Sequence, residues 1–415
     1  MPCPTTHSKS GRTRRFSRLG KDGHAPKRAP GRPPSRLHSK QLSRSLNSSM
    51  EWLPRVQSGH GSSLVTFDVH DSEAVELHRR NHRLDPHVIR KFRNSLLRKF
   101  EADDSALSHL PETMNVQLHS LSVKHRMDSA LDGATRLLLQ TSTSHVIECV
   151  ILRIASGRST ICVSSQVGCA AACDFCATGK LGIAKNLAVR EILDQVVLGG
   201  QILTNEGRRL DNIVFMGMGE PFHNSRAVTD AIRKLTDRDL FARSPASILV
   251  STVGIPEKMT EFAETLPGVN LALSLHSADS EKRRTLIPLE SKHPLKDLHE
   301  AIRQVNQLQG RPLMIEYLML DGVNDSHDAA NQLIRWVQGL NIRFNLIPFN
   351  AIEDAPHLMC SPREAIDRFA QQLREAGYQT TVRYSLGADI AAACGQLART
   401  LQPVQDQQNS IASAD

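Results

Sequence analysis

The chain has 415 residues, of which 40% are apolar, so it is long enough for a sizeable core and exceeds one average domain. No apolar run approaches the roughly 18 residues that cross a bilayer, so the sequence predicts no membrane span. Three of the eight cysteines, Cys169, Cys173 and Cys176, crowd into eight positions. That spacing is typical of a metal site in a reducing compartment and not of a disulfide framework.

The formal net charge of +8 is concentrated at the N-terminus. Residues 1–49 hold twelve Lys or Arg and a single acid, Asp22, so the remaining chain has a net charge of −3. This segment lacks apolar periodicity, and we expect it to be a disordered basic tail. Three origins stay open: an RNA-attracting arm, a start placed too early with the true initiator at Met50, or a targeting peptide. Residues 403–415 are expected to form a second disordered tail.

Between about residues 65 and 140 the pattern predicts helices, which would form a small, mainly helical accessory domain over residues 50–145. Asp85 and Pro86 make an N-cap and first-turn pair, and apolar residues then recur at helical spacing as far as Phe100. The other face is basic, with Arg79, Arg80, Arg83, Arg90, Lys91, Arg93, Arg98 and Lys99. This face is either the solvated side of an amphipathic helix or a contact for an RNA backbone.

From residue 146 to about 402, apolar runs alternate with amphipathic stretches. Strands are predicted at 146–152, 160–163, 212–216, 248–251, 270–274, 314–320, 343–347 and 380–384. Helices are predicted at 189–198, 295–308, 329–340 and 362–376. Repeated strand-then-helix units indicate an α/β fold with a parallel sheet, either open or curled into a barrel. Functional residues of such folds gather at the C-terminal ends of the strands.

The crowded cysteines follow the predicted strand at 160–163 in one short loop. Their separations are four and three residues, and small Ala and Gly neighbours let the backbone approach a metal centre closely. A structural zinc site usually takes four protein ligands in two pairs, and the sequence offers no second pair of matching spacing. Three thiolates instead suit a four-iron cluster that keeps one iron open for a substrate. Zinc stays as the alternative.

Five motifs occur in a fixed order around this loop. They are Cys162-Val-Ser-Ser-Gln-Val-Gly-Cys169, Met216-Gly-Met-Gly-Glu220-Pro, Ser274-Leu-His276, Ile347-Pro-Phe-Asn350 and Gly387-Ala-Asp-Ile-Ala-Ala-Ala-Cys394-Gly-Gln-Leu. The cysteine spacing is the signature of the radical S-adenosylmethionine (SAM) superfamily. Together the motifs resemble the RlmN/Cfr family of ribosomal RNA adenosine methyltransferases, over roughly residues 146–400.

The resemblance implies a partial barrel of six strand–helix units, a (β/α)6 radical SAM barrel that follows the accessory domain. It also implies one [4Fe-4S] cluster held by Cys169, Cys173 and Cys176, and SAM as cofactor, with two molecules used per turnover. The residues that match the SAM contacts of the family are Gly219, Glu220, Ser251, Ser274, Leu275, His276 and Asn350. A carboxylate near the ammonium group of the methionine moiety is electrostatically favourable.

The chemistry implied by the resemblance needs two further thiols. Carbons 2 and 8 of adenine are not nucleophilic, so they cannot attack the SAM methyl group directly. In the family, the cysteine matched by Cys394 takes a methyl group from one SAM, and a radical from a second SAM activates that methyl for addition to the base. Cys162 would then release the product by forming a disulfide bond with Cys394. Glu148 matches the family's proton acceptor. Taken alone, each thiol is more typical of a buried structural cysteine.

The resemblance further implies an RNA substrate, either large-subunit ribosomal RNA or, as a second candidate, transfer RNA, with carbon 2 preferred over carbon 8. It implies an electron donor such as flavodoxin or ferredoxin, and a cytoplasmic monomer without a membrane partner. The exact target stays open for two reasons. The family often has Arg before the Gly of its last motif, where this chain has Ser385-Leu386-Gly387, and residues 50–140 show little of the usual N-terminal pattern.

Two alternatives compete with RNA methylation. A radical SAM enzyme that acts on a small molecule or a protein would not need Cys394. A non-catalytic RNA-binding relative would keep only the scaffold. The second alternative is disfavoured because all five candidate cluster and catalytic cysteines are present.

Overall fold

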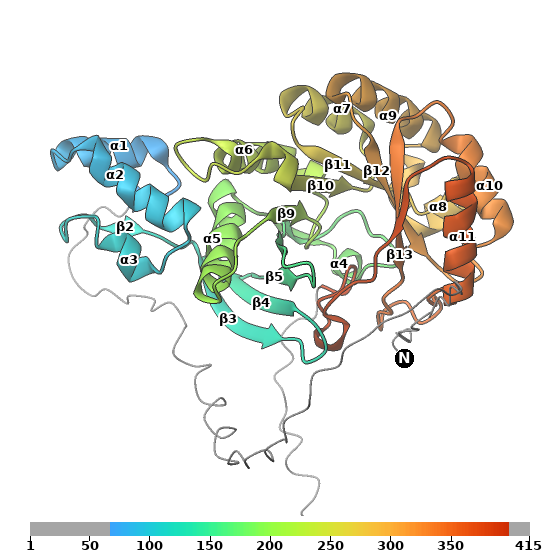
Figure 1. Cartoon of the computed structure of the whole chain (residues 1–415), viewed down its shortest axis with the longest axis horizontal. Coiled ribbons are helices and arrows are strands. Elements are labelled where there is room, and N and C mark those ends of the chain that lie inside the picture. The colour runs from blue at the N-terminus through green and yellow to red at the C-terminus, as the bar shows by residue number, and fades with distance from the viewer. Residues whose placement is uncertain (1–66, 398–415) are drawn as a thin grey trace, which may run out of the picture. The chain divides into compact units, whose positions relative to one another are not determined.

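The computed structural model describes residues 67–397 (Figure 1). The predicted tails at 1–49 and 403–415 and the alternative start at Met50 lie outside the described residues. None of the helices in the described part is long and apolar enough to cross a membrane.

A ten-stranded mixed sheet forms the centre of the described chain, in the order β14-β13-β12-β11-β10-β9-β6-β5-β4-β3. From β6 onward these strands pair in parallel. The parallel strands are β6 (Ser159–Cys162), β9 (Asn212–Phe215), β10 (Ile248–Thr252), β11 (Asn270–Ser274), β12 (Leu313–Met319), β13 (Ile342–Pro348) and β14 (Thr380–Val382). Each lies within two residues of its predicted range, because fully buried parallel strands are short apolar runs with clear ends.

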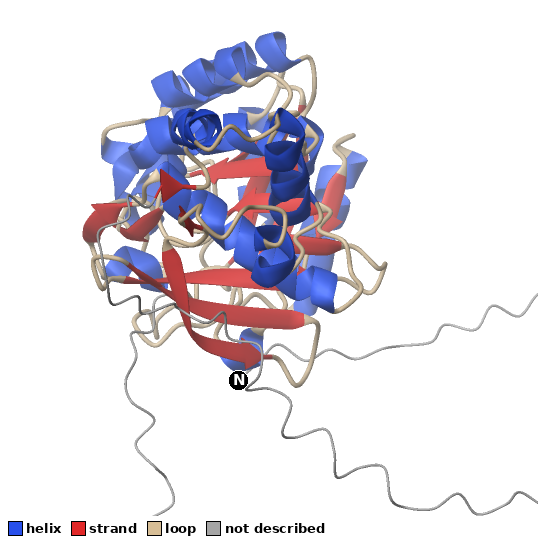
Figure 2. Cartoon of the chain, turned by 90° about the vertical axis from the view of Figure 1, so that its left-hand side faces the viewer, coloured by secondary structure: helices blue, strands red, loops and turns tan. Residues whose placement is uncertain are grey.

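Helices follow the strands and lie along the outside of the sheet (Figure 2). They are α5 (Val189–Asn205), α6 (Ser225–Thr236), α7 (Pro256–Thr265), α9 (Leu295–Gln309), α10 (His327–Trp336) and α11 (Arg363–Glu375), and the short α8 (Ser280–Leu286) precedes α9. Pairing each strand from β6 to β13 with its helix gives the six units of the predicted (β/α)6 fold, which is thereby confirmed. The sequence underestimated α5, which runs past residue 198, and it did not single out α6 or α7.

The edge of the sheet that ends in β3 differs from the prediction. Residues expected to be helical form β3 (Leu121–Asp128) and β4 (Ala134–Thr141), and these pair in antiparallel fashion with each other and with β5 (Val146–Arg153). The helical prediction is therefore wrong for this hairpin. The prediction failed because almost every residue of β4 is buried, on both faces of the sheet. A continuous apolar run of this kind is equally typical of a buried helix.

The helical prediction is confirmed before this hairpin. The segment holds α1 (Ser72–Asn81), α2 (Pro86–Arg93), the π-helical turn η1 (Asn94–Arg98) and α3 (Asp103–Leu107), with the short strands β1 (Phe67–Asp68) and β2 (Val116–Gln117) beside them. Asp85 caps α2 by accepting a hydrogen bond from the backbone N–H of His87, and Pro86 occupies the first turn.

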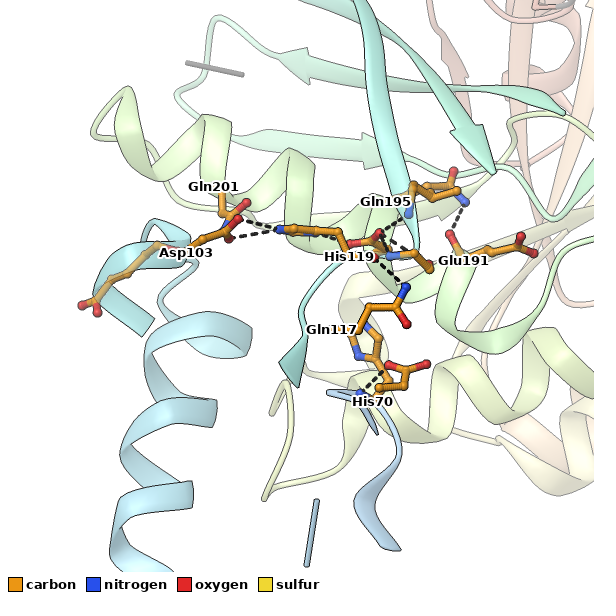
Figure 3. Close-up of polar contacts among 12 residues, drawn as sticks. His70, Asp103, Gln117, His119, Glu191, Gln195 and Gln201 are labelled. Atoms are coloured by element: carbon orange, nitrogen blue, oxygen red, sulfur yellow. Dashed lines mark hydrogen bonds and ion pairs between the residues drawn. The ribbon is translucent and has the colours of Figure 1, made fainter. Parts of the chain in front are cut away.

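A buried His–Asp network joins this segment to the barrel (Figure 3). The Nδ1 atom of His119 is 2.6 Å from Asp194 of α5, and its Nε2 atom is 3.0 Å from Asp103 of α3. Asp194 also accepts hydrogen bonds from the backbone N–H groups of Ser120 and Leu121. Burial alone would lower the pKa of His119, but Asp194 and Asp103 outweigh it and raise the pKa to about 10. His119 is therefore a buried cation held between two carboxylates.

Replacing His119 with leucine removes this cation and leaves Asp194 as a buried carboxylate without a counter-charge. We expect the free energy of unfolding at pH 7 to fall by about 3–5 kcal/mol, measured by urea denaturation. His357→Leu is the matched control, because His357 also pairs with an aspartate, Asp174, but is mostly exposed. Its substitution should cost less than about 1 kcal/mol.

The same variant should show a defined pH dependence. A group whose pKa is higher in the folded protein stabilises it fully below the unfolded pKa, here 6.5, and loses that effect as the pH rises through the folded value of about 10. The stability difference between wild type and His119→Leu should therefore shrink steadily from pH 7 to pH 10. A constant difference over this range would contradict the ion-pair assignment.

Candidate active site

The predicted site residues gather at one edge of the sheet, because parallel strands all end on the same side. Cys162 is the last residue of β6, Ser274 ends β11, and Ser251 lies in β10. Most of the others stand just beyond a strand end: Gly219 and Glu220 after β9, Leu275 and His276 after β11, and Asn350 after β13. Cys394 lies farther along the chain, after β14 and a short 3-10 helix, η5 (Ala388–Ile390). Tertiary structure thus collects residues that are spread over most of the chain.

The cysteine loop is closed by a small hairpin. The strands β7 (Gln166–Gly168) and β8 (Ile183–Asn186) pair across it, the short helix α4 (Ala177–Lys180) completes it, and the Cys169 N–H donates to the Gly182 carbonyl at 2.7 Å. Cys169 and Cys173 pack in an apolar cluster formed by strand ends and the loops that follow them. This cluster includes Leu286, Ile287, Leu318, Ile347 and Phe349. The thiols are therefore shielded from water.

Hydrogen-bond donors surround the thiols of the cysteine loop. The Ala171 N–H donates to the Cys169 sulfur at 3.4 Å, and N–H and O–H groups of Thr178 and Gly179 face Cys176. Hydrogen bonds to ligand sulfurs are typical of such clusters.

Glu220 is a buried acceptor next to the cysteine loop. One of its carboxylate oxygens accepts from the Thr252 hydroxyl at 2.7 Å and the Phe222 N–H at 3.0 Å, and the other accepts from the Val253 N–H at 2.9 Å. Burial nevertheless raises its pKa. The preceding Gly219 has φ +102°, and a Cβ there would lie 2.5 Å from the Gln166 side chain. Glycine is therefore required for this close approach of the two loops.

The two predicted serines meet around a carboxylate that the sequence did not single out. The Ser251 hydroxyl donates to Glu316 of β12 at 2.6 Å, and the Ser274 hydroxyl lies 3.4 Å from the same oxygen. The two hydroxyl oxygens are 3.2 Å apart. A polar residue inside the otherwise apolar run of β12 was the available signal for Glu316.

His276 is a buried, neutral imidazole. Burial, together with the positive charge of Arg283, lowers its pKa to about 3. Its Nδ1 atom accepts a hydrogen bond from the Leu318 N–H at 3.0 Å, so the proton of the ring belongs on Nε2. Arg283 is itself completely buried, pairs with Glu290 at 2.5 Å, and donates to the carbonyls of Leu275 and Val253. It therefore stabilises the loops after β10 and β11.

Cys162 and Cys394 lie near the same guanidinium group. Arg383 follows β14, and its Nη2 atom is 3.5 Å from the Cys394 sulfur. Burial and the neighbouring Cys394 raise the pKa of Cys162 to about 12, against the opposing effect of Arg383. Burial lowers the pKa of Arg383, but Cys394, Glu316 and Cys162 together outweigh it. The structure thus places Arg383 in contact with Cys394, and Cys162 near enough to both that they affect its pKa.

The segment that carries Cys394 is fixed from several directions. The Asn350 amide donates to the Cys394 carbonyl at 3.1 Å, and the Ala177 N–H donates to the Gly395 carbonyl at 2.8 Å. The second contact ties this segment directly to the cysteine loop, because Ala177 follows Cys176. All seven cysteines of residues 67–397 are free thiols, so the predicted disulfide bond is not present in this state.

Glu148 has a partner that the sequence did not indicate. It is buried on β5 and forms a bidentate ion pair with Arg136 of β4, at 2.9 and 2.5 Å. Arg136 also donates to the Ile390 carbonyl at 3.1 Å, within the Cys394 segment. The ion pair therefore connects the predicted proton acceptor to the backbone near the reactive thiol. Both oxygens of the Glu148 carboxylate accept a hydrogen bond from Arg136.

Comparison with known proteins agrees with this arrangement. A family model of the radical SAM superfamily matches residues 163–334. A probable RNA methyltransferase from Rhodopirellula baltica is 58% identical over 338 residues, which cover 81% of this chain and 88% of that protein. A probable dual-specificity RNA methyltransferase RlmN from Thermus thermophilus is 41% identical, over 64% of this chain and 75% of that protein. The chain belongs to the RlmN/Cfr family.

A solved structure supports the same conclusion at the level of the fold. The crystal structure of a radical SAM methyltransferase from Sphaerobacter thermophilus covers 78% of this chain and 96% of its own, with a TM-score of 0.74 and 36% identity. This RlmN/Cfr protein is therefore a radical SAM methyltransferase. The family implies a [4Fe-4S] cluster and SAM, in agreement with the thiols and hydrogen-bond donors of the cysteine loop.

Gly179 offers a test of the cysteine loop. A Cβ at this position would lie 2.9 Å from both the backbone N and O of Cys173, so Gly179→Ala must shift the backbone of the cysteine loop against α4. We expect the variant to bind less than half of the wild-type iron after anaerobic reconstitution, measured as iron and sulfide per chain. Gly310→Ala is the control, because a Cβ there meets open space and its left-handed φ of +64° puts the backbone strain at the end of α9, outside the cysteine loop. Equal iron content in Gly179→Ala and wild type would show that the loop tolerates the displacement.

Proposed function

We propose that this RlmN/Cfr protein methylates a ring carbon of adenine in RNA, carbon 2 in preference to carbon 8, through a methyl group carried on Cys394. The observation that carries the proposal is the position of Cys394. It lies beside Arg383 and near Cys162, on a segment hydrogen-bonded to the cysteine loop. A methyl group carried there would be close both to a cofactor bound at the loop and to a second thiol.

In this proposal Cys169, Cys173 and Cys176 hold the cluster, which supplies the electron that cleaves SAM. The SAM molecules bind to the residues that match the family's SAM contacts, which are Gly219, Glu220, Ser251, Ser274, Leu275, His276 and Asn350. One SAM would methylate Cys394, and a second would yield the radical. Glu220 suits the methionine ammonium because it is a carboxylate at the loop edge. The neutral His276 adds no charge to the site.

Product release is assigned to Cys162. The Cys162 sulfur attacks the Cys394 sulfur of the protein–RNA adduct and loses its thiol proton, the carbon–sulfur bond breaks, and a Cys162–Cys394 disulfide forms. The electron pair of the broken bond goes to the methylated adenine, which later takes up a proton. Glu148 is proposed to accept the proton from the base, and the contact of Arg136 with the Ile390 carbonyl couples that step to the position of Cys394.

The proposed RNA contact is the basic face of α1 and α2. Arg80, Arg83, Arg90 and Lys91 are exposed there, whereas Arg98 is turned inward and donates to the Leu240 carbonyl. Cations on one face neutralise phosphates irrespective of base sequence. We propose large-subunit ribosomal RNA as the substrate and transfer RNA as a second one, in line with the dual specificity in the name of the Thermus relative. A flavodoxin- or ferredoxin-like electron donor, a monomeric state and a cytoplasmic location complete the proposal.

Methyl-labelled SAM tests the route. The anaerobically reconstituted protein should transfer label first to Cys394 and then to RNA, and mass spectrometry of the modified nucleotide identifies the carbon. Cys394→Ala should lower RNA methylation at least 1,000-fold because it has no methyl carrier. Cys149→Ala replaces a buried thiol that has no role in the proposal, and its activity should stay within about twofold of wild type. Undiminished methylation by Cys394→Ala would favour a radical SAM enzyme of another substrate class.

Cys162→Ala separates release from methyl transfer. The variant should still place label on Cys394 and attack the RNA, but it should accumulate a covalent protein–RNA adduct, because no second thiol can attack the Cys394 sulfur. Denaturing gel electrophoresis with labelled RNA detects this adduct. Free turnover in Cys162→Ala would contradict the releasing role.

A further inference from the structure

A cavity with a volume of about 320 Å³ lies between the N-terminal segment and two helices of the barrel. It is lined by the end of β1 and the loop that follows, by residues 188–190 at the start of α5, and by Lys234 of α6. The residue before this start, Leu187, donates through its N–H to the Ser165 carbonyl at 3.1 Å, next to strand β7. One wall of the cavity is therefore joined to the hairpin that closes the cysteine loop.

The start of α5 faces this cavity without a side-chain cap. This helix has 17 residues, and its N-cap residue is Ala188, which has no side-chain oxygen to accept from the first-turn N–H groups. Glu191 accepts from the N–H of Ala188 itself, which precedes those groups. The other helix that begins at the cavity, α1, is capped by Asp71, which accepts from the N–H groups of Glu73 and Ala74. Uncapped N–H groups and the helix dipole make the start of α5 favourable for an anion.

His70 gives independent evidence for a ligand in this cavity. Only 5% of the residue is exposed, and within the described part of the chain its Nε2 atom has no hydrogen-bond partner. Its ring stacks on Phe241, and its backbone N–H donates to Asp68 at 2.8 Å. Burial lowers the pKa of His70, so the ring is neutral and can carry its one proton on Nε2. Buried polar atoms normally have a partner, so Nε2 indicates a ligand that accepts a hydrogen bond.

The charges around the cavity favour an anion of low charge. Arg190 is exposed at the cavity, and the ammonium group of Lys234 donates to the His70 carbonyl at 2.9 Å with two further N–H groups to offer. Asp68 and Asp71 accept from backbone N–H groups, and their negative charges oppose a multiply charged ligand. A phosphodiester carries a single negative charge, whereas inorganic phosphate is partly a dianion at neutral pH. The cavity therefore suits a phosphodiester better than free phosphate.

We propose that this cavity binds a backbone phosphate of the RNA substrate, through the first-turn N–H groups of α5 and the side chains of His70, Arg190 and Lys234. This inference rests on the proposed function, since it takes RNA as the substrate. It adds a defined phosphate site at the start of α5 to the basic face of α1 and α2. A phosphate contact fixes the position of the RNA on the protein and does not read its sequence.

Ala188→Asp tests the start of α5. The aspartate caps the helix and places a carboxylate where the phosphate would lie, and the backbone of Ala188 is already extended as an N-cap requires. The reconstituted holoenzyme is titrated with a fluorescein-labelled RNA stem-loop that has adenine in its loop, using fluorescence anisotropy. Binding should weaken roughly tenfold or more. The temperature of thermal unfolding should stay equal or rise, because aspartate is a preferred N-cap.

Ala246→Asp is the matched control. It introduces the same charge at an exposed alanine of η3 (Pro245–Ser247), the turn that precedes β10, and should bind the stem-loop as the wild type does. Methyl transfer from labelled SAM to Cys394 does not need RNA, so Ala188→Asp should also keep the wild-type level of this reaction. A selective loss of RNA binding would therefore assign the effect to the RNA contact.

Two variants test the individual donors. His70→Phe keeps a ring beside Phe241 and removes Nε2, and Arg190→Gln removes an exposed charge. Both should lower the RNA affinity severalfold, and Arg190→Gln should reduce the slope of log affinity against log salt concentration by about 1. His70→Phe should lose no thermal stability in the absence of RNA, because the Nε2 atom that it removes forms no hydrogen bond within the described residues.

Unchanged RNA affinity in either Ala188→Asp or His70→Phe would overturn the proposal. It would also be overturned if inorganic phosphate stabilised the wild type but not Ala188→Asp while both bound the stem-loop equally, because the cavity would then be a site for free phosphate. Failure of the wild type itself to bind the stem-loop would instead contradict the proposed RNA substrate, and this inference with it.

Discussion

The parallel pairing of β6 with β9 places the cysteine loop against the glycine-rich loop that ends in Glu220. Cys162 pairs with Val214, and backbone hydrogen bonds continue beyond both strands, from Gly217 to the Val163 carbonyl and from Ser165 to the Met218 carbonyl. Both loops leave their strands in the same direction because the strands are parallel. Glycine at positions 217 and 219 allows the two loops to share these hydrogen bonds, because a Cβ at either position would clash with the facing strand end.

Around this contact, charged groups are buried in pairs, and each pair holds a loop. Arg283 with Glu290 supports the carbonyls that follow β10 and β11, and Arg136 with Glu148 holds the carbonyl of Ile390. Removing one partner of such a pair leaves an uncompensated buried charge, so the loss of either partner would destabilise the loop that the pair holds. This edge of the sheet is therefore built on buried guanidinium groups and not on apolar packing alone. Arg383 differs from these two guanidinium groups. Its neighbours are the thiols of Cys162 and Cys394 and the carboxylate of Glu316, and within the described residues no salt bridge joins it to that carboxylate.

The antiparallel strands extend this organisation toward the N-terminal helices. The β3–β4 hairpin contacts the Cys394 segment, since Ser129 and Ala130 donate to Asp389, and it begins next to the His119 network. The N-terminal helices are thus joined to the segment that carries Cys394 by a continuous sheet and a buried ion pair.

The sequence by itself determined the barrel strands, the cysteine loop and the residues that match family motifs. Buried parallel strands are distinct apolar runs, and the cysteine spacing is a local property of the chain, so neither depends on knowing the partners. Only the tertiary structure decided the antiparallel hairpin, the pairing of Glu148 with Arg136, the contact of Arg383 with Cys394, and the meeting of Ser251 and Ser274 around Glu316. Each of these joins residues that are distant in sequence or buried on both faces. These contacts depend on which side chains the fold buries next to one another, and a local sequence pattern does not contain that information.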